Sequence, residues 1–172
     1  MATTKWVLDP MHSEVQFKVK HLVISTVTGS FKTFEGSVET EGDTFEGAIA
    51  EFSLDVNSID TNQEMRDGHL KGAEFFDAEK YPKISFKSTS ITADTLTGNL
   101  TIKDVTKPVT LDLEHGGTAT DFYGNLKAGF EITGKINRKD FGLVWDGVTE
   151  AGAIVLGSDI KLIINVQFAK QA

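Results

Sequence analysis

Apolar and polar residues alternate along most of this chain. The alternation is plain in Val15–Lys20, Phe52–Val56 and Val109–Leu113, where every second side chain is apolar. Successive residues of a β-strand point to opposite faces, so this period of two predicts strands with one buried face and one wet face. Further segments of the same kind are Thr26–Thr40, Lys83–Ile91, Leu96–Ile102, Phe122–Ile136 and Gly157–Phe168.

Glycine-containing turn sequences separate these segments. Examples are Thr97-Gly98-Asn99, Gly116-Gly117 and Asp146-Gly147. About eight or nine strands with mostly short connections are typical of an antiparallel barrel or a sandwich. No composition shift marks a boundary, so we expect an all-β fold in a single domain over residues 1–172.

The alternation stops between Asp60 and Pro82. Thr61 and Glu64 have the spacing of a capping box, which predicts a short helix over Asn62–Leu70. We therefore expect a helical excursion near residues 61–80. Long irregular segments within a compact domain are often binding loops, so this region is the first candidate for a functional site.

Three chemically active side chains lie in the predicted helix: Arg66, Asp67 and His69. Arg66 and His69 are three residues apart, so both can point toward one polar group. One interpretation is that they bind a ligand head group or act as acid and base. The other is that Arg66 and Asp67 only brace the loop against the barrel rim.

Composition predicts a core that needs no covalent support. Hydrophobic residues make up 40% of the 172 positions, charged residues 24%, and there is no cysteine. This excludes disulfide scaffolds, thiolate metal sites and cysteine nucleophiles. The 12 Phe against 2 Tyr and 2 Trp suit a dry core and an apolar ligand cavity equally well.

The net charge of -8 and the lack of a basic cluster argue against nucleic acid as a partner. The stretch Glu39–Asp55 carries six acidic residues and no base. This pattern is typical of a solvated strand face that discourages edge pairing, and an acidic docking surface is the alternative.

Other chemistry has weak support in the sequence. His12-Ser13-Glu14 offers hydrolase residue types, but no G-x-S-x-G elbow is present. The four histidines show no H-x-x-x-H spacing, and Glu39–Asp55 lacks the order of a calcium loop. We expect no metal, no cofactor and no enzymatic activity.

No stretch approaches the roughly 20 apolar residues of a membrane-spanning helix. The first residues also lack the apolar run of a secretory signal. These features predict a cytoplasmic protein; removal of a signal peptide would instead place it in the periplasm.

Several blocks of the sequence together resemble the YceI-like family of bacterial lipid- or polyisoprenoid-binding proteins. They follow the family's order over nearly the whole chain. The blocks are Trp6-x-Leu8-Asp9-x-x-His12-Ser13-x-Val15-x-Phe17-x-Val19-x-His21-Leu22, Ser58-Ile59-Asp60-Thr61-x-x-x-x-Arg66-Asp67-x-His69-Leu70, Phe75-Phe76-Asp77, Tyr81-Pro82-x-Ile84-x-Phe86, Gly98-x-Leu100-Thr101-Ile102-x-x-Val105-Thr106-x-Pro108-Val109 and Gly134-x-Ile136-Asn137-Arg138-x-Asp140-Phe141-Gly142-Leu143.

The resemblance implies an extended lipocalin-like antiparallel β-barrel whose interior holds a long apolar chain, isoprenoid or fatty-acyl. It also implies a role in transport or storage without chemistry, and subunits that often pair as homodimers. Two alternatives stay open: a lipid-modifying enzyme that uses Arg66, Asp67 and His69, and an interaction module that uses the Glu39–Asp55 face.

If the alternating strands face a tunnel, one side of each strand would line it. The expected tail-lining residues are Val15, Phe17, Val19, Ile84, Phe86, Leu100, Ile102, Leu111, Phe130, Ile132, Leu162 and Ile164. The expected head-group or rim residues are Arg66, Asp67, His69, Arg138 and Asp140.

Overall fold

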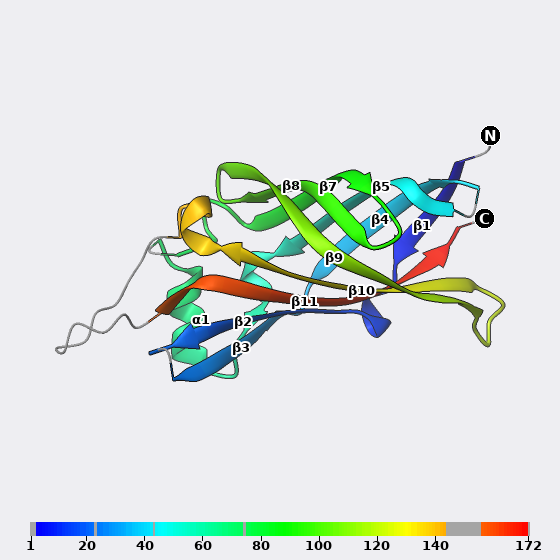
Figure 1. Cartoon of the computed structure of the whole chain (residues 1–172). Coiled ribbons are helices and arrows are strands. Elements are labelled where there is room, and N and C mark those ends of the chain that lie inside the picture. The colour runs from blue at the N-terminus through cyan, green and yellow to red at the C-terminus, as the bar shows by residue number, and fades with distance from the viewer. Residues whose placement is uncertain (1–2, 23, 43, 74, 144–155, 172) are drawn as a thin grey trace.

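Strands dominate the structure and close into a barrel (Figure 1). The computed structural model describes residues 3–22, 24–42, 44–73, 75–143 and 156–171. The strands are β1 (Thr3–Leu8), β2 (Glu14–His21), β3 (Ser25–Phe31), β4 (Phe34–Glu41), β5 (Thr44–Asp55), β6 (Ile59–Asp60), β7 (Lys83–Ile91), β8 (Thr95–Ile102), β9 (Val105–Thr120), β10 (Leu126–Asn137) and β11 (Leu156–Lys170). The helices are α1 (Glu64–Lys71) and the 3-10 turns η1 (Pro10–His12), η2 (Val56–Ser58) and η3 (Arg138–Phe141).

Eight strands form the closed antiparallel ring, in the order β1-β4-β5-β7-β8-β9-β10-β11. The ring closes because β1 pairs with β11, with Leu8 opposite Phe168. The predicted all-β barrel of about eight strands with one short helix is therefore confirmed.

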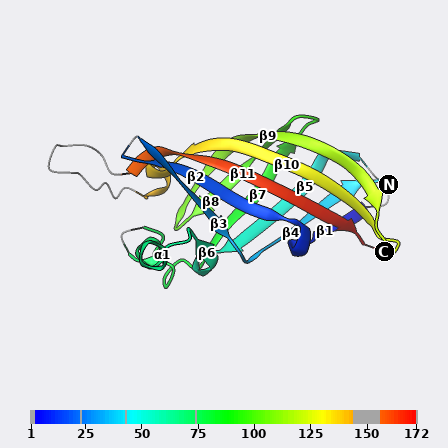
Figure 2. The same cartoon turned by 90° about the horizontal axis from the view of Figure 1, so that it is seen from below.

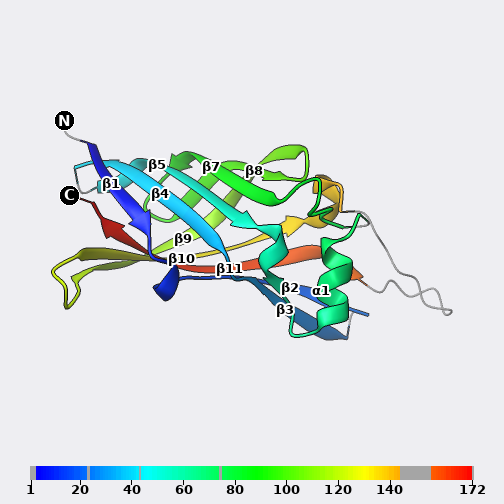
Figure 3. The same cartoon turned by 180° about the vertical axis from the view of Figure 1, so that it is seen from behind.

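The sheet extends beyond the closed ring because β11 is long enough to pair with two different strands along one of its edges. Its C-terminal end pairs with β1, and the stretch from Ile160 to Asn165 pairs with β2. β3 continues the sheet from β2, and the two-residue β6 pairs with the end of β3. This extension lies at the end of the barrel opposite the chain termini (Figure 3).

Two predicted strands differ in extent from the strands of the structure. Thr26–Thr40 is divided into β3 and β4, because the chain leaves one partner for another near Lys32. Phe122–Ile136 loses its first residues to a turn, in which the Asp121 carboxylate accepts hydrogen bonds from the backbone N–H groups of Tyr123 and Asn125.

Two of the predicted glycine turns are wrong. Gly98 lies inside β8, and Gly116-Gly117 lies inside β9. Near the second pair the register between β9 and β10 shifts, and Gly117 has φ of 110°, which marks a bulge instead of a turn. The predicted turn at Asp146-Gly147 lies outside the described residues.

The helical excursion is present, but the predicted capping box is wrong. α1 begins at Glu64, and its N-cap is Gln63, whose side chain accepts a hydrogen bond from the Met65 N–H. Thr61 does not cap the helix because its hydroxyl bonds instead to side chains of α1. Among the described residues, no helix is long and apolar enough to cross a membrane.

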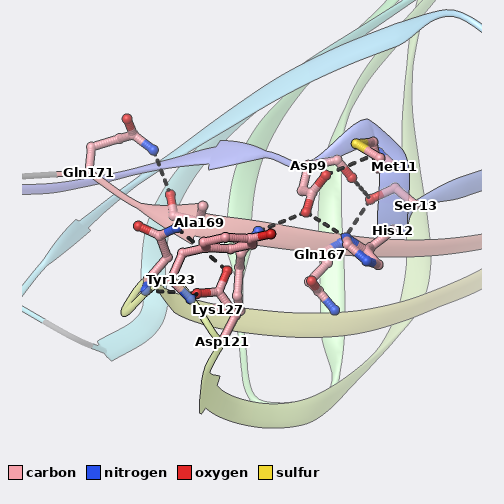
Figure 4. Close-up of polar contacts among 11 residues, drawn as sticks. Asp9, Met11, His12, Ser13, Asp121, Tyr123, Lys127, Gln167, Ala169 and Gln171 are labelled. Atoms are coloured by element: carbon pink, nitrogen blue, oxygen red, sulfur yellow. Dashed lines mark hydrogen bonds and ion pairs between the residues drawn. The ribbon is translucent and has the colours of Figure 1, made fainter.

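A charged cluster fixes the bend between β1 and β2 (Figure 4). The Asp9 carboxylate accepts hydrogen bonds from Lys127 Nζ at 2.7 Å and from the Met11 N–H at 3.0 Å, and it lies 2.7 Å from His12 Nδ1. Both Asp9 and Lys127 are largely buried. The hydrogen bond from Lys127, with help from His12 and Met11, lowers the pKa of Asp9 from 3.8 to about 2, although burial opposes the shift.

Replacing Asp9→Asn should lower the free energy of unfolding by about 1 kcal/mol at neutral pH, once solvent screening is allowed for. Folding lowers the pKa of Asp9, so this stabilisation is present above its ordinary pKa of 3.8 and is lost as pH falls toward 2. Urea unfolding of both proteins across this range should show their midpoints converging at low pH. Asp104→Asn, at an exposed position, is the control; an unchanged difference at all pH values would contradict the assignment.

Candidate functional site

A cavity of about 410 Å³ occupies the interior of the barrel. Its volume falls within the roughly 300–1,000 Å³ of small-molecule sites in proteins. Most of the side chains that border it are aliphatic or phenyl groups. The described polar residues on its border are Gln16, His21, Glu51, Thr61, Arg66, His69, Ser85 and Arg138.

Every tail-lining residue expected from the strand pattern borders this cavity. Several, such as Phe17, Leu100 and Ile164, are half-buried although they point inward. Their inner faces border empty space, which keeps them accessible. The wall is therefore built from the apolar face of each strand, as period-two alternation requires.

Further apolar residues on the border were not expected from the sequence. Leu96 and Val166 continue the alternation of their strands, so the pattern contained a signal for them. Phe31 also carried this signal, since it shares a face of β3 with Val27. Phe75 and Phe76 lie in the irregular stretch after α1 and carried none. The rings of Phe31 and Phe76 pack edge to face at 6.2 Å near the helical end of the cavity.

Glycines in the barrel wall allow large side chains of neighbouring strands to pack against the wall. A Cβ atom on Gly29 would lie 2.3 Å from the ring of Phe17, and one on Gly98 would lie 2.4 Å from the ring of Phe86. Gly134 is related to Leu111 in the same way. Each glycine removes the side chain that would push its neighbour into the lumen, so the centre of the barrel stays open.

An aromatic cluster closes the end of the cavity near the chain termini. Phe45 contacts Trp6, Phe130 and His115, with ring centroids 4.9–5.3 Å apart. Phe168 packs edge-on against Phe130. Trp6 is fully buried, and its indole N–H donates to Thr40 Oγ1. This cluster forms the floor against which the end of a ligand chain would stop.

α1 lies at the end of the barrel opposite the chain termini (Figure 2). Arg66 and His69 are exposed and also border the cavity, so the cavity reaches the surface beside α1. The His69 ring packs edge-on against Phe75 at 5.1 Å. Of the expected rim residues, Arg66, His69 and Arg138 border the cavity, and Asp67 and Asp140 do not.

Asp67 and Arg66 are joined through Thr61. Arg66 donates from Nε to Thr61 Oγ1 at 2.7 Å and from its terminal nitrogen to the Thr61 carbonyl at 2.5 Å. The Thr61 hydroxyl and N–H both donate to Asp67 Oδ1. These bonds brace the loop between β6 and α1, and they also fix the direction of the guanidinium group.

Arg138, in η3, links separate parts of the main chain by hydrogen bonds. Its side chain is 2% exposed, and it donates to the Leu143 carbonyl at 2.6 Å and to the Gly157 carbonyl at 2.8 Å. Asp140, in the same turn, is exposed. Arg138 therefore ties two distant positions of the chain together beside the cavity.

Part of the acidic stretch is paired within the barrel. On β5, Glu51 lies 3.5 Å from Lys87 and Asp55 lies 3.9 Å from Lys83, both on the neighbouring β7. The lysines that the stretch itself lacks are thus supplied by the next strand. Over the described ranges, no group of three or more histidine and carboxylate side chains is arranged to hold a metal ion.

Comparison with known proteins agrees with this architecture. The model of the YceI-like domain family matches residues 6–168. The UPF0312 protein SA2479 of Staphylococcus aureus is 35% identical over 167 residues, covering 96% of this chain and 98% of that protein.

Two solved structures share the fold. A YceI protein of Campylobacter jejuni is 33% identical, with a TM-score of 0.73 over 89% of this chain and 90% of its own. A polyisoprenoid binding domain from Saccharophagus degradans, implicated in plant cell wall breakdown, is 15% identical, with a TM-score of 0.70 over 96% of this chain and 98% of its own.

Replacing Gly98→Ala should destabilise the barrel by about 2 kcal/mol, because the added methyl group overlaps the Phe86 ring and the Lys87 carbonyl. Chemical unfolding measures the loss. Gly129→Ala is the matched control, since a Cβ atom there meets nothing within 4 Å. Equal stability of the two variants would show that Phe86 does not depend on the space above Gly98.

Proposed function

This chain belongs to the YceI-like family, and we propose from that premise that its barrel binds the apolar chain of a long amphiphile, polyisoprenoid or fatty-acyl in type. It would serve as a carrier or reservoir and perform no chemistry on the ligand. The single observation that carries the proposal is the apolar cavity of about 410 Å³ inside a closed barrel.

The energetics support binding without a charged contact. Burying a methylene group gains about 0.8 kcal/mol, so ten of them gain roughly 8 kcal/mol before the cost of ordering the chain. A dissociation constant of 1 μM corresponds to a net gain of about 8 kcal/mol, so a chain must bury more than about ten methylene groups to reach it. A chain that enters deeply toward the aromatic floor would therefore bind with useful affinity. The S. degradans relative is named a polyisoprenoid binding domain, which supports a ligand of that type.

The polar residues of the border support holding a ligand over transforming it. Asp67 accepts hydrogen bonds from Thr61 and does not border the cavity. Arg138 is buried against main-chain carbonyl groups. General acid–base catalysis needs titratable groups within hydrogen-bond reach of the reacting atoms. The border holds His21, Glu51 and His69, but most of the wall is hydrocarbon, which suits an apolar chain better than a reacting polar group.

Native mass spectrometry of protein purified from its own host tests the proposal directly. We expect a long-chain apolar molecule to remain bound and to be released by organic extraction. Protein that is always empty, together with failure to take up any added chain, would contradict the proposed function.

Filling the cavity should abolish uptake of an apolar dye. Ile164 borders the cavity, and its neighbour Ile163 on β11 does not, so Ile164→Trp fills the lumen while Ile163→Trp adds the same side chain to the other face. Nile red fluorescence should show at least about tenfold weaker binding for Ile164→Trp alone, since several buried methylene contacts are lost. Equal binding by the two variants would place the dye outside the barrel.

A further inference from the structure

Two side chains of α1, Arg66 and His69, are exposed and border the cavity where it meets the surface. His21, at the end of β2, and the buried Arg138 of η3 also border the cavity. Among the described residues, Glu51 is the one acid on the border, and it pairs with Lys87. Two arginines and one acid therefore stand among the described residues of the border, whereas the whole chain has a net charge of -8.

Arg66 is held in place by uncharged oxygen atoms. Within the described residues, its two side-chain hydrogen bonds both go to Thr61, one to the hydroxyl and one to the carbonyl. Across the described part of the chain, no carboxylate lies within ion-pair distance of its guanidinium group. A guanidinium group has five N–H donors, so most of them remain for another acceptor.

Thr61 and Asp67 determine where the remaining donors point. Thr61 is 3% exposed, and its hydroxyl donates to Asp67 while accepting from Arg66. The Asp67 carboxylate thus orients the Thr61 hydroxyl, which orients Arg66. A fixed guanidinium fork at the edge of an apolar cavity is suited to carboxylate and phosphate oxygens, because it can offer them two parallel hydrogen bonds.

We propose that Arg66 binds an anionic head group, a carboxylate or a phosphate monoester, so that the ligand is an acidic amphiphile with its chain in the barrel. The inference rests on the proposed function and names the chemical class of its ligand. The apolar lumen excludes a charged group, and the head group therefore lies at the mouth beside α1. Thr61 and Asp67 are positioning residues for Arg66.

Displacement of Nile red by four ligands with one chain length tests the head group: palmitic acid, cetyl phosphate, cetyl alcohol and palmitamide. All are used below their critical micelle concentrations. We expect one or both anions to bind about tenfold more tightly than the alcohol and the amide, the gain of one charge-assisted hydrogen-bond pair at a partly exposed site. Comparison of palmitic acid with cetyl phosphate distinguishes a carboxylate from a phosphate head group. Added salt should reduce the preference for the anions over the neutral ligands.

Arg66→Gln should remove the preference for the two anions over the alcohol and the amide. Arg66→Lys, which keeps the charge without the fork, should restore part of it. Lys71→Gln is the matched control, because it removes one positive charge from the same helix at a position that does not border the cavity. Thermal unfolding of each variant checks that the barrel is intact.

Thr61→Val tests the positioning role. It should reduce the ratio of anion to alcohol affinity, because Arg66 loses the hydroxyl that orients it. A residue that only stabilised the loop would change the affinities for all four ligands alike and leave this ratio unchanged.

Three outcomes overturn the inference. Equal binding of all four ligands would show that the mouth does not select charge. An equal loss for all four in Arg66→Gln would show that Arg66 only braces the loop. Binding of none of them, with Nile red retained, would count against the proposed long-chain ligand itself and not against the head group alone.

Discussion

The antiparallel pairing of β1 with β11 closes the barrel, and the rest of the structure depends on this closure. In a closed ring each strand finds its hydrogen-bond partners on both sides, so the wall keeps its shape without side chains filling the centre. β11 makes this possible by pairing with β10 over Lys127–Asn137 and dividing its other edge between β1 and β2.

Where β11 changes partner from β2 to β1, the hydrogen bonds between strands are interrupted. Polar groups of the segment between β1 and β2 take their place. The Ser13 hydroxyl donates to the Asp9 carbonyl and accepts from the Gln167 N–H. The Asp9 carboxylate in turn meets Lys127 on β10. Ser13, which in the sequence is one of the residue types of a hydrolase, therefore has a structural role. Its hydroxyl satisfies backbone groups where the partner strand changes.

The interior is shaped by the balance between large and small residues on the inner faces. Enough phenyl and aliphatic groups face inward to pack a solid core, and at the Trp6 end they do so. Farther along, Phe17 and Phe86 lie against glycines of the adjoining strands and leave space between the walls. At the helical end this space reaches Arg66 and His69 of α1, so the cavity runs from an aromatic floor to a border with polar side chains.

Alternation along the chain was sufficient to predict strands, an antiparallel barrel or sandwich, and which residues of a strand share a face, because side-chain direction in a strand is fixed by period. Leu100 and Ile164 could be placed on the apolar faces of their strands on this basis, and the resemblance to a barrel family added the expectation that these faces line a lumen. The same reasoning failed at Gly98 and Gly116, since a glycine in a turn looks the same in sequence as one that makes room for a ring, as Gly98 does, or one beside a bulge, as Gly116 does. Only the tertiary structure decided that the apolar faces enclose a cavity, because that depends on which side chain lies against which glycine across strands. It also decided that Thr61, expected to cap a helix, instead links Asp67 to Arg66, because hydrogen-bond partners in a loop are set by how the loop packs.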